Sequence, residues 1–162
     1  MEKGCFYFIK DSYFLEFIDP NLMKNKENGN RRPCFFYFKD ENNIIWLIPI
    51  SSKVEKFKGI YENKVKKYGY CNNIYFGEVL GVESVFLLQN MFPITEEYIS
   101  EQYIYGEKPV KIKYEQEKEL SKLGKKILAL HKSKPNLRLI IPNVFEIEKK
   151  LKENMKKIRP FV

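Results

Sequence analysis

The sequence from residue 34 reads Cys34-Phe35-Phe36-Tyr37-Phe38, then Lys39-Asp40-Glu41-Asn42-Asn43, then Ile44-Ile45-Trp46-Leu47-Ile48. Aromatic and β-branched residues favour strands, and a short polar connection favours an antiparallel pairing of the two runs. This stretch therefore predicts a β-hairpin, around which the rest of the fold is arranged. The hairpin is followed by Pro49-Ile50-Ser51-Ser52-Lys53, in which Pro49 and two hydroxyl residues are expected to mark the end of the second strand.

Other segments outside the last third also have strand or loop character. Further strands are expected at Cys5–Ile9, Asn72–Leu80 and Val85–Leu88, and an edge segment at Asn90–Ile94 with Thr95 capping a turn. A short helical turn is expected at Ser12–Phe17. Residues Leu22–Arg32 are polar and lack periodicity, which predicts an exposed, mobile basic loop.

The last third changes to a helical period. Leu120, Leu123, Ile127 and Leu130 share one face of a helix expected from about Glu115 to Lys132, before Pro135. A second helix is expected after Asn143, with Glu146 three residues later as in a capping box. Its inner face comprises Val144, Ile147, Leu151, Met155 and Ile158. Strands first and helices last predict one α+β domain over residues 1–162, an antiparallel sheet with flanking helices.

The charge is distributed unevenly. Residues 1–110 hold 14 Lys/Arg and 15 Asp/Glu, a net charge of −1, whereas residues 111–162 hold 15 Lys/Arg and 6 Asp/Glu, a net charge of +9. A basic C-terminal third indicates a polyanionic partner, although lysine-rich, solvated helix faces would give the same count.

The cysteines and the hydropathy indicate a cytoplasmic protein. Cys5, Cys34 and Cys71 are far apart and odd in number, which favours reduced core thiols over disulfides or a zinc site. No apolar run approaches the roughly 18 residues that a membrane span requires.

The residues that could carry chemistry are few. The single histidine, His131, lies near the end of the first long helix, where a cation suits the negative end of the helix dipole. One histidine and no clustered carboxylates argue against a transition-metal hydrolase. Any phosphoryl chemistry would thus be free of metal and cofactors, and RNA cleavage satisfies this condition because the substrate supplies its own 2′-hydroxyl nucleophile.

Ser51, Ser52 and Lys53 place two hydroxyls, successive backbone amides and an ammonium within three residues. Such a group can cradle one phosphate. A polar exit from a strand produces the same tripeptide for structural reasons, so the tripeptide alone does not decide between the two interpretations.

The order of the motifs resembles a known family. Phe6-Tyr7-Phe8-Ile9 with Tyr13, a polar loop ending in Arg32-Pro33, the aromatic hairpin, Pro49–Lys53 and Asn90–Ile94 together resemble the ToxN/AbiQ toxins, CptN-type members included, of type III toxin–antitoxin systems. The resemblance covers nearly the whole chain. It implies a twisted antiparallel sheet or open barrel with flanking helices, similar to MazF/Kid toxins, and a metal-independent endoribonuclease that leaves a 2′,3′-cyclic phosphate.

The resemblance also implies site residues. The family's active site falls here on Ser51, Ser52 and Lys53, and Tyr13 matches a tyrosine that family members place beside it. The family commonly has a proline between the serine and the lysine. This chain lacks that proline, so Lys56 is the alternative catalytic lysine.

The implied partner is an RNA antitoxin, a small folded and pseudoknotted repeat RNA that the toxin processes and that inhibits it in a toxin–RNA hetero-oligomer active against phage. RNA contacts are expected from Lys10, Arg31, Arg32 and Lys56, and from the helix stripe Lys118, Lys122 and Lys125. A non-enzymatic RNA- or DNA-binding module with the same basic helices is the alternative.

Overall fold

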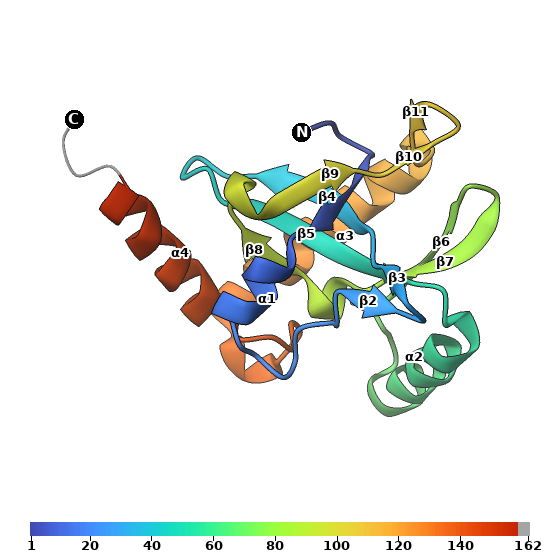
Figure 1. Cartoon of the computed structure of the whole chain (residues 1–162). Coiled ribbons are helices and arrows are strands. Elements are labelled where there is room, and N and C mark those ends of the chain that lie inside the picture. Colours follow the sequence, from blue (N-terminus) through green and yellow to red (C-terminus); the bar gives the residue numbers. More distant parts are fainter. Residues whose placement is uncertain (159–162) are drawn as a thin grey trace.

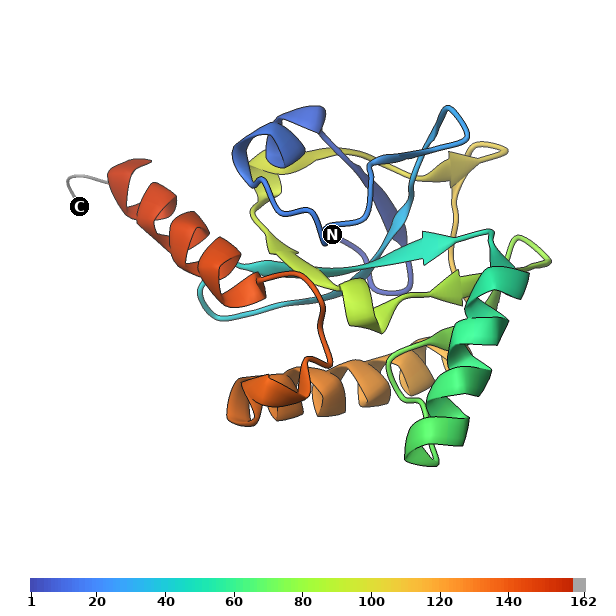
Figure 2. The same cartoon turned by 90° about the horizontal axis from the view of Figure 1, so that it is seen from below.

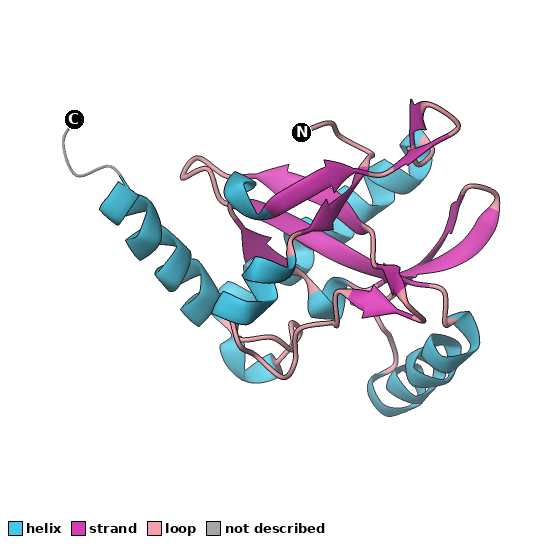
Figure 3. Cartoon of the chain, in the orientation of Figure 1, coloured by secondary structure: helices cyan, strands magenta, loops and turns pink. Residues whose placement is uncertain are grey.

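A computed structural model describes residues 1–158 and places the aromatic hairpin at the centre of a seven-stranded antiparallel sheet, shown in Figures 1 and 3. The strands of this sheet are β1 (Phe6–Ile9), β4 (Cys34–Lys39), β5 (Ile45–Ser51), β6 (Tyr75–Val79), β7 (Val82–Phe86), β8 (Phe92–Ile94) and β9 (Ile99–Gln102). Two small hairpins join β2 (Lys26–Glu27) to β3 (Asn30–Arg31) and β10 (Ile104–Tyr105) to β11 (Lys108–Pro109). The predicted hairpin and α+β class are confirmed.

Strand β5 is the branch point of the sheet. One of its edges pairs with β4, and its other edge pairs first with β8 and then with β7. All seven residues of β5 are buried. Ser51, which ends this strand, is paired with Val85 of β7.

The expectation that Pro49 marks the end of the strand is wrong, because β5 continues to Ser51. The carbonyl of Pro49 accepts a hydrogen bond from the Leu87 amide at 2.9 Å. In a strand the N and O of one residue face the same edge, so the missing N–H of Pro49 faces the edge where β5 changes its partner from β8 to β7. Proline is tolerated there because no strand ladder needs its N–H.

The helices lie around the sheet. They are α1 (Asp11–Glu16), α2 (Val54–Tyr68), α3 (Tyr114–Ser133) and α4 (Val144–Ile158), with short 3₁₀ turns at Leu88–Asn90, Glu96–Tyr98 and Pro135–Leu137. Figure 2 shows α3 running beneath the sheet, α2 near the β6–β7 hairpin, and α4 extending away from the body. The predictions of α1, α3 and α4 are confirmed. The face of α4 is buried only at Val144, Ile147 and Leu151, whereas Ile158 is exposed.

Helix α2 is absent from the sequence-based expectations, although its sequence contains a signal for it. Val54, Phe57 and Ile60 recur at helical spacing. Gly69 then closes the helix in the left-handed conformation, with φ of +83°. The buried ring of Phe57 attaches the helix to a second, smaller apolar cluster.

The predicted mobile loop at Leu22–Arg32 is only partly correct, because it contains the β2–β3 hairpin. The two residues of its turn, Asn28 and Gly29, both have positive φ, of +51° and +80°. Asn-Gly is the favoured pair for this kind of two-residue turn, which was the overlooked signal. The hairpin carries Glu27 and leads into Arg32, and both reach the end of β5.

The core is rich in aromatic side chains. Trp46, Tyr13, Phe6, Phe35 and Phe86 are all completely buried. Large aromatic side chains stabilise a small domain strongly because each buries a large apolar area. In residues 1–158, no helix has both the length and the apolar composition to cross a membrane.

Candidate functional site

The residues Ser51, Ser52 and Lys53 form the link between the central strand and α2, because β5 ends at Ser51 and α2 begins at Val54. Ser51 is buried and Ser52 is exposed. The Lys53 side chain is 52% exposed. The structure thus brings a hydroxyl and an ammonium to the surface, directly beside a buried strand end.

A carboxylate that sequence reasoning missed lies next to these residues. The Ser51 hydroxyl donates to Glu27 Oε1 at 3.2 Å, and Lys53 Nζ lies 3.7 Å from the same oxygen. Arg32 Nη1 donates to the other oxygen, Oε2, at 3.0 Å. Glu27, on the β2–β3 hairpin, therefore contacts two of the predicted catalytic residues.

The environment of Ser51 changes the role expected for it. Its hydroxyl donates to Glu27, and its oxygen accepts a hydrogen bond from the Lys53 amide at 3.2 Å. With its hydroxyl hydrogen so used and its side chain buried, Ser51 does not point at solvent. It orders the turn that presents Ser52 and Lys53.

The start of α2 adds to the positive potential of this link. Residue Lys53 occupies the N-cap position, and no side-chain hydrogen bond caps the helix. Amides in the first turn of a helix lack intrahelical partners and carry the positive end of the dipole. An anion beside Ser52 would face this helix end as well as the Lys53 ammonium.

The structure removes Tyr13 from the candidate catalytic group. Its ring is completely buried among Phe17, Phe92 and Tyr98, and its hydroxyl donates to the Pro93 carbonyl at 2.8 Å. Burial raises the pKa of Tyr13 well above its ordinary value. A buried, hydrogen-bonded phenol with a raised pKa can neither stack on an RNA base nor exchange protons with solvent, so this expectation was wrong.

The three basic residues outside the helices that were expected to contact RNA have different environments. Arg32 is buried and bonded to Glu27, Ile50 and the Lys24 carbonyl, so its expected RNA contact is wrong. Arg31 is exposed, pairs with Glu101, and lies over the Phe8 ring at 4.4 Å. Lys10 is exposed and donates to the Glu97 carbonyl at 2.7 Å. Arg31 and Lys10 remain accessible to a ligand.

The lysines predicted on the helices are all exposed. Lys56 lies in the first turns of α2, with its Nζ 5.5 Å from the Phe57 ring centroid. The stripe formed by Lys118, Lys122 and Lys125 lies on α3. Neither position shares a hydrogen bond or ion pair with Ser51, Ser52 or Lys53 among the described residues.

His131 is not the cation at a helix end that its position in the sequence predicts. It does lie in the last turn of α3, but it is buried, and its ring stacks on Phe145 of α4 at 5.1 Å. Its Nδ1 has no hydrogen-bond partner within residues 1–158. Burial lowers the pKa of His131, so the neutral imidazole is favoured.

The cysteines agree with the expectation of unpaired thiols. Cys5 and Cys34 are buried, Cys71 is half-buried, and all three are free. Burial raises the pKa of Cys34 to about 12, which leaves its thiol unreactive. Across residues 1–158, the His, Cys, Asp and Glu side chains form no group of three that could hold a metal ion.

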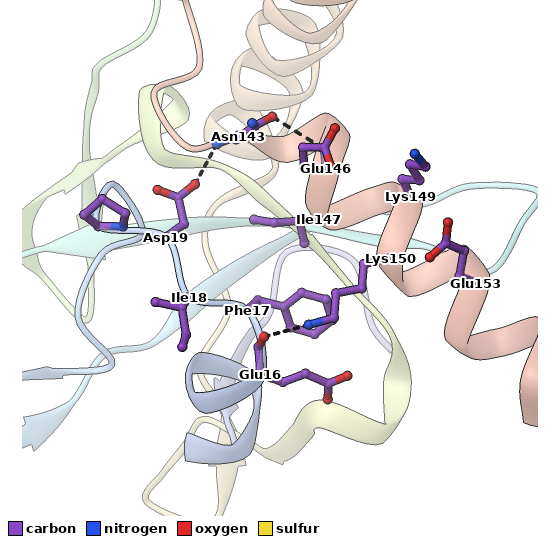
Figure 4. Close-up of a pocket in the computed structure, with 11 residues that line it drawn as sticks. Glu16, Phe17, Ile18, Asp19, Asn143, Glu146, Ile147, Lys149, Lys150 and Glu153 are labelled. Carbon is purple, nitrogen blue, oxygen red and sulfur yellow. Dashed lines mark hydrogen bonds between the residues drawn. The ribbon is translucent and has the colours of Figure 1, made fainter.

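A groove of about 740 Å³ lies elsewhere, between the end of α1 and the first turns of α4 (Figure 4). Asn143 Oδ1 accepts a hydrogen bond from the Glu146 backbone amide and so caps α4. The backbone amide of Asn143 donates to Asp19 Oδ2 at 2.7 Å, and not to the Glu146 side chain as a capping box requires. Lys150 donates to the Glu16 carbonyl at 2.9 Å. These contacts attach the start of α4 to the segment that ends α1, so Asn143, Asp19 and Lys150 are used in packing.

The chain is therefore a small α+β protein with a branched antiparallel sheet and a polar cluster where the central strand meets a helix. This is the fold of AbiQ, a lactococcal anti-phage endoribonuclease belonging to the type-III toxin–antitoxin system. The TM-score is 0.66 over 96% of this chain and 99% of AbiQ, at 13% sequence identity. No family model and no curated protein sequence matches the chain. The fold implied by the resemblance to ToxN/AbiQ toxins is confirmed.

Proposed function

We propose that this chain is a metal-independent endoribonuclease and the toxin of a type III toxin–antitoxin system. The observation that carries the proposal is the likeness in fold, over nearly the whole of both chains, to AbiQ, an endoribonuclease of such a system. The exposed Ser52 and Lys53 at the end of the central strand support it from the chain's own residues.

The proposed reaction uses the substrate's 2′-hydroxyl to attack the adjacent phosphorus. The products are a 2′,3′-cyclic phosphate and a free 5′-hydroxyl. The protein has to orient the scissile linkage and to neutralise the charge that develops on the phosphate. A preorganised ammonium and hydroxyl can supply these two functions.

Each residue of the link has a proposed role. The Lys53 ammonium stabilises the pentacoordinate phosphate, and Ser52 donates to a non-bridging oxygen, with the first amides of α2 beside it. Ser51 acts indirectly, by ordering the turn that presents Ser52 and Lys53, because its hydroxyl oxygen accepts a hydrogen bond from the Lys53 amide. Lys53 is preferred to Lys56 as the catalytic lysine because only Lys53 shares the Glu27 carboxylate with Ser51 among the described residues.

The proposal predicts that Lys53→Ala slows RNA cleavage by about 10²-fold or more, because one preorganised charge partner of the transition state is lost. The measurement is the cleavage rate of a defined RNA by purified protein in excess chelator, with the cyclic phosphate identified on the product. Chelator should leave the wild-type rate unchanged.

Lys58→Ala is the matched control, since Lys58 is a partly exposed lysine of α2 that pairs with Glu55 and Glu83. Its rate should stay within a few-fold of wild type. A Lys53→Ala rate equally close to wild type contradicts the mechanism, and a large loss in Lys56→Ala instead transfers the role to that residue. Wild-type protein that binds RNA without cutting it indicates the non-enzymatic binding module.

The proposed partner is an RNA antitoxin, a small folded repeat RNA that the enzyme cuts from its precursor and that then occupies the site. The exposed lysines of α3, together with Lys10 and Arg31, are the proposed contacts. A toxin–RNA hetero-oligomer in the cytoplasm, active in abortive infection by phage, is the corresponding assembly.

A further inference from the structure

Cleavage by the 2′-hydroxyl needs a group that accepts its proton, and the proposed roles of Ser51, Ser52 and Lys53 do not include this one. Histidine is the usual base, but His131 lies between α3 and α4 against Phe145. The exposed groups of the link, Ser52 and Lys53, supply a hydroxyl and an ammonium, neither of which is a base when Lys53 is charged. The base must therefore be a side chain that contacts the link.

Among residues 1–158, one carboxylate contacts the link. Glu27 Oε1 lies 3.2 Å from the Ser51 hydroxyl oxygen and 3.7 Å from Lys53 Nζ. Its side chain is 13% exposed, so it is sheltered but open on one side. Lys53 would hold a non-bridging oxygen of the phosphate. Because Glu27 Oε1 lies 3.7 Å from the Lys53 ammonium, it would then lie close enough to reach the 2′-hydroxyl next to that phosphate.

The two oxygens of Glu27 have different partners, which suits them to different tasks. Oε2 accepts from Arg32 Nη1 at 3.0 Å, and the same Arg32 nitrogen donates to the Ile50 carbonyl at 2.7 Å. This buried guanidinium fixes the carboxylate against β5. Oε1 accepts from the Ser51 hydroxyl, and its 3.7 Å distance to Lys53 Nζ is longer than a hydrogen bond, so Lys53 can turn to a phosphate and leave one lone pair of Oε1 free.

We propose that Glu27 is the general base of this site. In the attack, the 2′-oxygen forms a bond to phosphorus while its proton passes to Glu27 Oε1. The bond from phosphorus to the 5′-oxygen breaks, and that oxygen leaves with a proton taken from water. The hydroxide so formed removes the proton from Glu27, which restores the carboxylate.

The β2–β3 hairpin holds this base in place. Glu27 pairs with Asn30 across the hairpin, and the turn at Asn28 and Gly29 closes it. The charged or titratable groups that face the carboxylate are Arg32, from the link between β3 and β4, and Lys53, at the start of α2. Ser51 of β5 adds a neutral hydrogen bond.

This inference rests on the proposed function, and Glu27→Gln tests it because glutamine keeps the shape and loses the basic oxygen. The expected loss in kcat is at least about 10²-fold. In the wild type, kcat/KM should fall in acid as a carboxylate takes up a proton, and in Glu27→Gln this acidic limb should disappear. Binding of an RNA with a 2′-deoxy group at the scissile position should stay within a few-fold of wild type.

Glu27→Asp and Glu83→Gln complete the test. Glu27→Asp keeps a carboxylate, so it should retain part of the activity and the acidic limb, even if the glutamine variant is less stable. Glu83→Gln removes an exposed carboxylate that pairs with Lys58, and its rate should match wild type.

Cleavage by wild type, and its loss in Lys53→Ala, would uphold the proposed function. With the proposed function upheld, several outcomes would still overturn the inference about Glu27. They are a Glu27→Gln rate within a few-fold of wild type, an unchanged acidic limb, and equal losses in the Gln and Asp variants. Faster cleavage by Glu27→Gln also overturns it, and indicates a carboxylate that blocks the phosphate site. Absence of cleavage by wild type itself contradicts the proposed function.

Discussion

Ser51 and Ser52 are adjacent in the sequence, yet they have opposite environments. Ser51 is the last residue of β5 and points inward to Glu27, whereas Ser52 lies outside the strand and is exposed. Side chains alternate between the two sides of a strand, so the point at which the strand ends decides which hydroxyl is exposed. The Glu27 carboxylate contacts Ser51 and Lys53, although Glu27 lies 24 residues from Ser51 along the chain.

His131 carries a prediction for stability. Burial lowers the pKa of His131 in the folded state below its unfolded value near 6.5. The unfolded chain therefore binds the proton more tightly, and the free energy of unfolding should fall as the pH drops below about 6.5, by no more than about 1.4 kcal/mol per pH unit for this one group. Above that pH the contribution is constant.

The measurement is the free energy of unfolding by urea between pH 7.5 and pH 5, compared with that of His131→Leu. The leucine variant keeps an apolar side chain of similar volume next to Phe145 and cannot titrate. It should lose less stability in acid than wild type. Parallel pH dependences for the two proteins would contradict the prediction.

At the scale of elements, α3 depends on a close approach to β4 at Gly124. A Cβ atom added to Gly124 would lie 2.8 Å from Cζ of Tyr37, and the Tyr37 hydroxyl is held by the Ser121 carbonyl at 3.2 Å. The ring therefore cannot easily move away. Gly124→Ala should lower the free energy of unfolding by about 1–3 kcal/mol, despite the higher helix propensity of alanine.

Gly59→Ala in α2 is the matched control. Gly59 is an exposed helical glycine, and an added Cβ would meet no atom within 4 Å among the described residues. There the propensity gain is unopposed and should raise the free energy of unfolding by about 0.5–1 kcal/mol. Thermal or urea unfolding of both variants checks the pair, and a gain in stability for Gly124→Ala would show that the sheet and α3 can separate at this point.

At the scale of the whole molecule, the basic C-terminal third is divided between two places. Helix α3 lies beneath the sheet and α4 extends away from it, as Figure 2 shows. The lysines of residues 111–158 therefore do not gather on one helix face. The stripe of Lys118, Lys122 and Lys125 is exposed and lies on α3.

The proposed RNA partner predicts that protein purified at low salt carries a discrete RNA of limited length, which rising salt releases. Counterion release makes the logarithm of the binding constant fall linearly with the logarithm of the salt concentration. The triple variant Lys118→Gln, Lys122→Gln and Lys125→Gln should reduce this slope by about 2, because up to three phosphate contacts are lost. Titrations of the recovered RNA at several salt concentrations measure the slope.

Lys39→Gln serves as the control, since Lys39 lies at the hairpin turn and pairs with Glu96. Its slope should equal that of wild type. An unchanged slope for the triple variant would remove the α3 stripe from the RNA-binding surface while leaving the Ser52 and Lys53 site untouched.

The sequence by itself determined the elements whose signal is local: the aromatic hairpin, the helices α1, α3 and α4, the cap at Asn143 and the α+β class. Local propensity and periodicity are sufficient for these because each element shows its buried face within a few turns or a few alternations. Asn28-Gly29 and the spacing of Val54, Phe57 and Ile60 carried similar signals that predict β2–β3 and α2.

Only the tertiary structure decided which side chains meet. It placed Tyr13 and Arg32 inside, kept Lys53 at the surface, and brought Glu27 to the end of β5, 24 residues along the chain from Ser51. These outcomes depend on burial and on pairing between distant segments, which composition and spacing do not encode. The physical reason is that a polar side chain has the same sequence signature whether its partner is water or a buried charge.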